Sequence, residues 1–332
     1  MKTVLLTGCA GFIGFHVGSR LLESGHRVIG IDNLNQYYNE GLKTSRLALL
    51  LDRSAFRFQQ MDITDRSKVE KLFRENEFGP VIHLAAQAGV RYSLENPYLY
   101  IASNVTGFVN LIEEARKKRV PHFIYASSSS VYGANKKTPF SETDYVDHPV
   151  SLYAATKKSN ELIAHVYAHL YGLPVTGLRF FTVYGPWGRP DMALFKFCKA
   201  IWAGTPIDVY NNGNMLRDFT YIDDIVQGVV RILEEVPGWG RPDAASDDSS
   251  ALYRLYNIGN NHPVKLTRLI EILETEIGRK AQINWLPMQP GDVPTTYADI
   301  SRLAGVVGYR PGTSIEVGVG RFVTWYREYY KL

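Results

Sequence analysis

Short β-rich runs alternate with helical segments through the first half of this 332-residue chain. The predicted strands are Thr3–Thr7, Arg27–Asp32, Phe56–Gln60, Val81–Leu84, His122–Ala126 and Val175–Leu178. The predicted helices between them are Phe12–Glu23, Gly41–Leu51, Arg66–Glu75, Asn104–Lys118 and Leu152–Tyr171. Strands that alternate with helices of this length indicate βαβ units, so we expect a doubly wound, parallel α/β sheet. The loops that leave the carboxyl ends of its strands would meet at one edge, where ligands bind.

The pattern changes from about residue 183, where Pro and Gly become frequent and the strands shorten. Helices are predicted over Ala193–Ala203, Asp224–Glu235 and Leu266–Ile277, and the polar stretch 238–250 predicts an exposed loop. We therefore expect one domain over residues 1–182, to which parts of 211–260 return. A smaller C-terminal α/β substrate lobe over 183–332 would lie on the ligand edge of the sheet.

Composition narrows the classes of protein that the chain can belong to. The formal net charge is +4, from 37 basic and 33 acidic residues without a basic block, so we expect no nucleic-acid binding. The two cysteines follow no ligand spacing, and His165 and His169 lack a third partner, so neither a disulfide nor a metal site is expected. No apolar run reaches the roughly 18 residues of a membrane span, so we expect a cytoplasmic protein that does not contact membranes.

A glycine-rich loop directly follows the first predicted strand. Gly8, Gly11 and Gly14 form a GxxGxxG motif that opens a helix with Phe12 and Ile13. In a Rossmann-type fold such glycines allow a tight turn, close approach to a pyrophosphate, and close packing of helix on strand. The free N–H groups and the positive dipole end of the helix favour phosphates. A purely structural turn is the alternative, but the position after the first strand favours a dinucleotide site.

Further residues at the ends of the predicted strands extend this cofactor site. Asp32 ends the second strand, where a carboxylate can accept hydrogen bonds from both ribose hydroxyls and would repel a 2′-phosphate. The cofactor is therefore expected to be NAD, although Asp is also a common turn residue. Topology places Asp62 and Ile63 near the adenine, and Leu84, Ala85 and Ala86 near the nicotinamide ribose. Asn33 and Lys43, in the segment that follows Asp32, are further candidates for cofactor binding.

A serine cluster and a YxxxK pair predict the catalytic centre. Ser128, Ser129 and Ser130 follow the fifth predicted strand, which would bring their hydroxyls to the ligand edge. Tyr153 and Lys157 lie four residues apart, on one face of a predicted helix. Oxidation of an alcohol needs a base, and a nearby ammonium would lower the pKa of a phenol that is otherwise a poor base at neutral pH. We therefore expect Tyr153 to be the base, Lys157 its partner and Ser128 the orienting hydroxyl.

These motifs resemble the extended short-chain dehydrogenase/reductase family over nearly the whole chain. Within that family the sequence is similar to the UDP-glucuronate 4-epimerases. The stretches that carry this similarity are 32–46, 179–193, 217–224 and 288–294. The resemblance implies the roles given above for Ser128, Tyr153 and Lys157. It also implies that Ser129, Ser130 and Thr182 lie against a sugar carboxylate with Arg189 nearby, that Arg217 contacts a UDP pyrophosphate, and that Arg91 is a weaker candidate for the same anionic pocket.

The implied reaction inverts C4 of UDP-glucuronate, giving UDP-galacturonate through a 4-keto intermediate while the NAD stays bound. UDP-glucuronate decarboxylase and UDP-glucose 4-epimerase remain alternatives, and so does a non-catalytic protein that senses NAD. The position before Val131-Tyr132-Gly133, where related dehydratases and decarboxylases carry an acid, is Ser130 in this chain. The resemblance also implies a homodimer that forms through the helices predicted over Asn104–Lys118 and Leu152–Tyr171.

Overall fold

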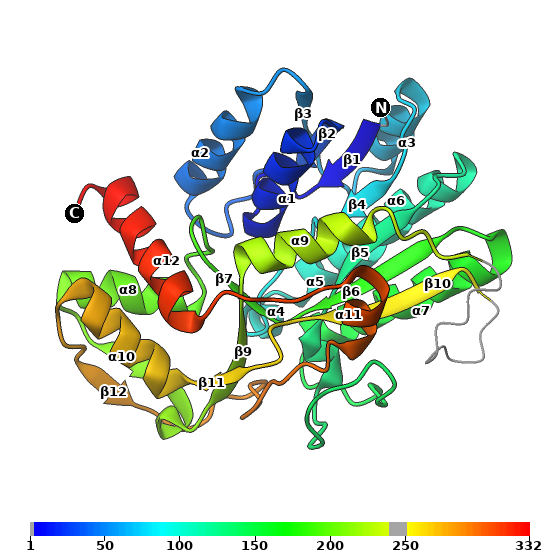
Figure 1. Cartoon of the computed structure of the whole chain (residues 1–332). Helices are drawn as coiled ribbons and strands as arrows, with labels where there is room; N and C mark the ends of the chain where they lie inside the picture. The colour runs from blue at the N-terminus through cyan, green and yellow to red at the C-terminus, as the bar shows by residue number, and fades with distance from the viewer. Residues whose placement is uncertain (1–2, 239–250) are drawn as a thin grey trace.

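A parallel sheet of seven strands forms the centre of the molecule (Figure 1). The computed structural model describes residues 3–238 and 251–332, so nearly all of the loop expected over 238–250 lies outside the described residues. The strand order is β10-β6-β5-β4-β1-β2-β3, and every neighbouring pair is parallel. The strands are β1 (Thr3–Thr7), β2 (Arg27–Asp32), β3 (Phe56–Gln60), β4 (Val81–His83), β5 (Phe123–Ser128), β6 (Val175–Phe180) and β10 (Tyr253–Ile258).

Helices cover both faces of this sheet because alternate strand residues are apolar on both sides. In β1, Val4 and Leu6 belong to one buried cluster and Leu5 to another. The helices that pack into the first cluster are α1 (Phe12–Glu23), α2 (Glu40–Leu51) and α9 (Ile222–Ile232). Those that pack into the second are α3 (Arg66–Glu75), α6 (Gly107–Lys117) and α7 (Leu152–Tyr171). The predicted doubly wound Rossmann-type fold is therefore confirmed.

A smaller group of elements lies beside the sheet and gathers at one end of the molecule (Figure 1). Its helices are α8 (Ala193–Ala203), α10 (Leu266–Ile277) and α12 (Ile315–Tyr330), with α11 (Ser301–Val307) nearer to β10. One small sheet has the order β11-β9-β7, and a second pairs β12 with β8. These strands are β7 (Thr182–Tyr184), β8 (Ile207–Val209), β9 (Leu216–Tyr221), β11 (Pro263–Lys265) and β12 (Ile283–Trp285).

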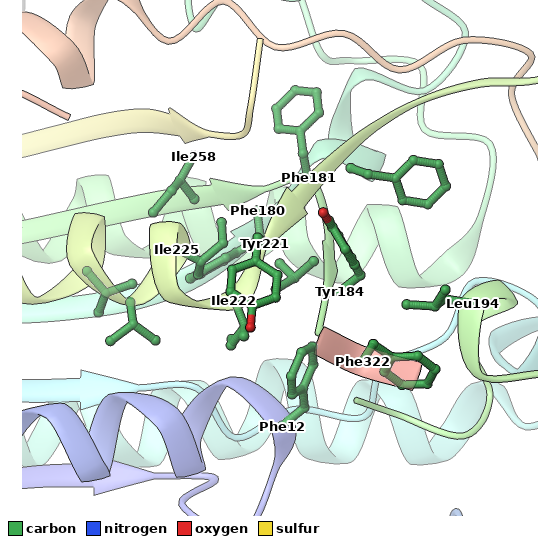
Figure 2. Packing of buried hydrophobic residues seen from close by; sticks show 14 of the residues in the cluster. Phe12, Phe180, Phe181, Tyr184, Leu194, Tyr221, Ile222, Ile225, Ile258 and Phe322 are labelled. Atoms are coloured by element: carbon green, nitrogen blue, oxygen red, sulfur yellow. The ribbon is translucent and has the colours of Figure 1, made fainter. Parts of the chain in front are cut away.

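One buried cluster joins the small elements to the sheet. Figure 2 shows Phe12 of α1 near Phe322 of α12, with Tyr184 and Tyr221 from the small sheet beside them. All four side chains are buried. The loops at the carboxyl edge of the large sheet thus lie between two parts that share a core.

Short helical segments complete the fold. They are α4 (Tyr92–Glu95), α5 (Pro97–Tyr100), the π-helix η1 (Ile101–Thr106), and the 3-10 helices η2 (Ser129–Tyr132) and η3 (Tyr210–Gly213). The helix expected to begin at Asn104 as an α-helix therefore starts as a π-helix at Ile101. Among the described residues, no helix has both the length and the apolar character that a membrane span requires.

Candidate active site

The glycine loop between β1 and α1 is shaped for close contact with a ligand. Gly8 has a φ of +71°, and a Cβ at this position would lie within 3 Å of the backbone of Leu84 and Ala85. A Cβ at Gly14 would lie 2.0 Å from the carbonyl oxygen of Gly8, so only glycine lets the first turn of α1 pack this closely. The N-cap of α1 is Gly11, which has no side chain to cap the helix. The first N–H groups of α1 are therefore available to an anion such as a pyrophosphate.

Asp32 stands at the carboxyl end of β2 with its two oxygens held by the backbone. Oδ2 accepts from the N–H of Ala10 at 3.1 Å, and Oδ1 accepts from the N–H of Leu34 at 2.9 Å. Burial raises the pKa of Asp32, while these bonds and the charge of Lys43 act in the opposite direction. Each carboxylate oxygen retains a second lone pair, which can accept a hydrogen bond from a ribose hydroxyl.

The neighbouring polar residues form a second layer around Asp32. The amide of Asn33 donates to Asp62 at 2.8 Å, and the ammonium of Lys43 donates to the backbone and side-chain oxygens of Asn35 at 2.6 Å each. Lys43 is buried, with 5% of its surface exposed. The three predicted cofactor residues Asn33, Lys43 and Asp62 thus shape one polar pocket beside β2.

The serine cluster turns sharply where β5 ends. Ser128 caps η2, since its hydroxyl accepts from the N–H of Ser130 at 3.2 Å and donates to the Ser130 hydroxyl at 3.1 Å. Ser127, one residue earlier, points to the opposite face and donates to Glu161 of α7 at 2.6 Å. The alternation of side chains along a strand explains why the hydroxyl of Ser127 is directed to α7, whereas that of Ser128 is directed to Ser130.

Tyr153 and Lys157 lie in the first half of α7, beside the serine cluster. The ammonium of Lys157 donates to the carbonyl oxygen of Ala126 at 2.8 Å, and burial lowers its pKa to about 8. Burial raises the pKa of Tyr153, while a hydrogen bond with Ser128 and the charge of Arg189 act to lower it. The direction is opposite to the lowering expected from Lys157, because here the ammonium is directed at a backbone carbonyl and the phenol is desolvated.

Arg189 is bound to a carboxylate of this chain. Its Nε donates to Oδ1 of Asp191 at 3.0 Å, and its Nη2 donates to Oδ2 of the same residue. Tyr37, from the loop between β2 and α2, donates its hydroxyl to Oδ2 at 3.2 Å. Neither Tyr37 nor Asp191 was predicted from the sequence. The one available signal was the length of the similar stretches 32–46 and 179–193, in which these two residues lie.

Two further predicted arginines flank Asp292. Arg91 donates to its carboxylate at 2.9 Å and lies over the ring of Tyr210, 4.6 Å from the centroid. Arg217 is held by the carbonyl oxygens of Leu216 and Pro294, and burial lowers its pKa while the charge of Asp292 raises it. The site therefore places two guanidinium groups and one carboxylate where an anion was expected. Asp292 is another residue that the sequence did not single out.

Every site residue predicted from the sequence lines one cavity of about 1030 Å³. From the cofactor site these are Gly8, Gly11, Phe12, Ile13, Gly14, Asp32, Asn33, Lys43, Asp62, Ile63, Leu84, Ala85 and Ala86. From the catalytic and substrate sites they are Arg91, Ser128, Ser129, Ser130, Tyr153, Lys157, Thr182, Arg189 and Arg217. The cavity runs from the glycine loop past the tyrosine to the small sheet. A dinucleotide and a second anionic ligand could therefore lie end to end, with Tyr153 between them.

A parallel sheet with a glycine loop at the first helix, and a serine, tyrosine and lysine at its carboxyl edge, defines a dinucleotide-dependent enzyme that acts on an alcohol carbon. Residues 4–259 match the NAD dependent epimerase/dehydratase family, and the chain belongs to this family.

Relatives of known name narrow the comparison. The chain is 50% identical to the "Probable UDP-glucuronate 4-epimerase" of Rhizobium meliloti (strain 1021), covering 98% of this chain and 97% of that protein. It is also 50% identical to UDP-glucuronate 4-epimerase 2 of Arabidopsis thaliana, covering 99% of this chain and 76% of the plant protein. Among solved structures, UDP-glucuronic acid 4-epimerase from Bacillus cereus, in complex with UDP-glucuronic acid and NAD, superposes with a TM-score of 0.89 at 34% identity, covering 99% of this chain and all of that one.

Proposed function

We propose that this protein is a 4-epimerase that interconverts UDP-glucuronate and UDP-galacturonate and keeps its NAD throughout. The family, the named relatives and the complex with UDP-glucuronic acid and NAD all support this function. The observation that carries it is the shared cavity, which is lined by Arg189, the serine cluster and Tyr153 together. A cation and several hydroxyl donors suit a sugar acid better than a neutral sugar.

The cofactor site fits an NAD. Gly8 and Gly14 allow the tight turn and the close backbone packing that set the start of α1, and this uncapped start supplies N–H donors for a pyrophosphate. Asp32 would accept hydrogen bonds from the adenosine ribose and would repel a 2′-phosphate, which favours NAD over NADP. When bound, the nicotinamide would accept a hydride from sugar C4 and later return it.

Side chains of the protein would bind the substrate and transfer the proton of its C4 hydroxyl. Tyr153 would take the proton of the C4 hydroxyl through its phenolate, and Ser128 would orient that hydroxyl. Lys157 lies one helical turn from Tyr153 and would hold the nicotinamide ribose and stabilise the phenolate. Arg217 and Arg91 would anchor the UDP pyrophosphate, so that the 4-keto sugar can turn about this link and present its other face.

The carboxylate of the 4-keto intermediate must be controlled, because a β-keto acid loses CO₂ when its carboxylate aligns with the carbonyl. In each of the two bound orientations of the sugar, the rotation of the carboxylate would be fixed by charge-assisted hydrogen bonds from Ser129, Ser130, Thr182 and Arg189. Ser130 stands where a decarboxylase or dehydratase would carry an acid, and Ser128 donates to its hydroxyl. These residues favour epimerisation over loss of CO₂.

We further infer the organisation of the chain in the cell. Residues 1–182 would form the NAD-binding domain together with α9 and β10, and the rest of 183–332 would form the substrate lobe. Two chains would pair through α7 and α6, the helices expected over Leu152–Tyr171 and Asn104–Lys118. The buried, unpaired thiols of Cys9 and Cys198 are consistent with the reducing cytoplasm.

Purified protein incubated with UDP-glucuronate tests the proposed reaction. We expect UDP-galacturonate to appear without added NAD, without net NADH and without CO₂, while UDP-glucose is turned over far more slowly. Release of CO₂ with a UDP-pentose would identify a decarboxylase instead. Equal turnover of UDP-glucose would identify a neutral-sugar epimerase, and binding of NAD without turnover of either sugar would indicate a sensor.

A further inference from the structure

The carboxylate of Asp191 is already paired with Arg189, the cation that is expected to bind the carboxylate of the acidic sugar. Two nitrogens of Arg189 donate to the carboxylate of Asp191, as described above. Each of the two side chains keeps 23% of its surface exposed, and both line the cavity that holds Tyr153. An incoming sugar carboxylate would therefore meet a guanidinium that already has a carboxylate partner.

Asp191 is held from its other side by Tyr37. The Tyr37 hydroxyl donates to Oδ2 of Asp191, and its ring lies 5.0 Å from that of Tyr92. Gly89 makes room for this hydroxyl, because a Cβ there would lie 2.4 Å from it. Asp191 is thus held both by Arg189 and by Tyr37 of the loop that follows Asp32.

The backbone before Arg189 is fixed, so only side chains can exchange partners here. Arg46 of α2 is fully buried and donates through Nε to the carbonyl oxygen of Trp187 at 3.1 Å and through Nη2 to that of Gly188 at 3.2 Å. The Arg189 guanidinium extends from this anchored turn into the cavity. A change of partner at Arg189 therefore needs only a rotation of its side chain.

Charge argues for competition between the two carboxylates. One guanidinium that faces two carboxylates in a partly desolvated cavity leaves a net negative charge, and like charges repel. A partly buried arginine without any partner is also unfavourable. During epimerisation the sugar has to turn over, so its carboxylate must leave Arg189 and the cation would lose its ligand at that moment.

We propose that Asp191 is a positioning residue that replaces the sugar carboxylate on Arg189 whenever the sugar turns. Because Asp191 competes for Arg189, the sugar carboxylate is bound weakly enough for the keto sugar to rotate. Tyr37 keeps Asp191 in a position from which it can pair with Arg189 again. The proposal rests on the epimerase function proposed above.

The variant Asp191→Asn tests this directly, since it keeps the shape and one hydrogen-bond acceptor but removes the competing charge. We expect roughly tenfold tighter binding of UDP-glucuronate, because about one charge-assisted hydrogen bond is freed for the substrate. Calorimetry should show no such gain for UDP-glucose, which has no carboxylate. We also expect kcat to fall, with reduced nicotinamide accumulating on the enzyme as seen in its near-ultraviolet absorbance, because the keto sugar turns more slowly.

Tyr37→Phe should also tighten binding of UDP-glucuronate and lower kcat, but by smaller factors than Asp191→Asn. Asp191 stays in this variant but loses the hydrogen bond from Tyr37. Asp52→Asn, at the exposed end of α2, is the matched control and should behave as the parent. Weaker binding of UDP-glucuronate to Asp191→Asn would overturn the proposal, as Asp191 would then simply hold Arg189 in place for the substrate. Unchanged affinity and unchanged turnover would overturn it as well.

The two proposals fail in different ways. If the parent does not epimerise UDP-glucuronate, the proposed function is wrong. The affinities of Asp191→Asn for the acidic and the neutral nucleotide sugar still decide whether Asp191 competes for Arg189, since they need no turnover.

Discussion

Tyr153 combines a partly buried phenol with two groups that favour its ionised form. Burial opposes the phenolate, whereas Ser128 and the charge of Arg189 support it. Lys157 keeps its ammonium on the carbonyl oxygen of Ala126 and lies one helical turn away. The acidity of Tyr153 therefore depends on which charges share the cavity with it, and the positive charge of an oxidised nicotinamide would add to those of the protein.

The pH dependence of kcat/KM follows from these pKa directions. The proposed base must lose its proton, so below its raised pKa the phenolate fraction grows about tenfold per pH unit. Above about pH 8 the increase in kcat/KM should level off. The pKa of Lys157 is lowered to about 8, so its ammonium loses its proton in this range. Initial rates with UDP-glucuronate from pH 6 to about pH 9 measure this curve.

Tyr153→Phe should remove the rise with pH and lower turnover by roughly 100-fold or more. The matched control is Tyr145→Phe, since Tyr145 is 85% exposed and lies outside the cavity. A flat profile in the parent, or near-normal turnover in Tyr153→Phe, would exclude Tyr153 as the base.

At the level of single residues, the sequence predicted which side chains share the cavity but not how they pair. Motifs at strand ends were sufficient for the glycine loop, Asp32 and the serine cluster, because parallel strands bring their carboxyl ends to one edge. The family resemblance was needed for Thr182 and for the three arginines. The contact between Tyr37 and Asp191 was missed because the two residues are 154 positions apart. The pairing of Asp191 with Arg189, two positions away, was missed because it depends on side-chain rotamers. The pKa of Tyr153 was expected to move in the other direction because burial and the target of the Lys157 ammonium depend on packing.

Helix α7 links the catalytic face to the core through one more turn of helix. Glu161 follows Tyr153 and Lys157 at the same spacing of four and receives two hydrogen bonds from Arg179 of β6, at 2.8 and 2.9 Å. The side chains of this pair are 4% and 2% exposed. The same carboxylate accepts from Ser127 of β5, so Glu161 joins α7 both to β6 and to the strand that leads into the serine cluster.

Arg179→Met should therefore destabilise the protein by about 3–5 kcal/mol, because it leaves the Glu161 carboxylate buried without its partner. The double variant Arg179→Met with Glu161→Gln should recover part of this loss, since no unpaired charge remains. Urea unfolding of the parent, both single variants and the double variant measures the coupling. Additive losses in the double variant would show that the pair does not act as a unit.

At the level of elements, helices with a strong hydrophobic periodicity were predicted correctly, whereas a helix with a low intrinsic helix propensity was missed. Helices α8 and α10 have the predicted bounds, whereas α12 was not predicted. Its sequence contains two glycines and several β-branched residues, which disfavour an isolated helix. It is helical because of packing: a Cβ at Gly318 would lie 2.2 Å from the Tyr184 hydroxyl, so glycine is needed where α12 meets the small sheet.

The outer face of α7 carries an apolar stripe that the described part of the chain leaves uncovered. Leu162, Val166 and Leu170 follow each other at a spacing of four and are 57%, 47% and 63% exposed. Leu94, Tyr98 and Ile101, in the segment that leads into α6, are also more than 40% exposed. An apolar surface of this kind is typical of an interface between chains, which supports the proposed homodimer.

Val166→Asp should convert a dimer into monomers, because a symmetric interface would bury the new charge twice. Light scattering or sedimentation at micromolar concentration gives the mass. Val317→Asp on α12 is the control, since Val317 is 49% exposed but lies on another helix. A parent that sediments as a monomer at the same concentration would contradict the dimer.

Strand β10 is the last to join the large sheet, and the chain reaches it only after the small elements have begun. It pairs with β6 along six residues. A fragment that ends at residue 182 would leave the backbone N–H and C=O groups on that side of β6 open to water or to another sheet. The half of the protein that holds the glycine loop is thus completed from the other half. We therefore expect that two fragments divided at residue 182 would each expose unpaired surface and aggregate. The two parts should fold together as one unit.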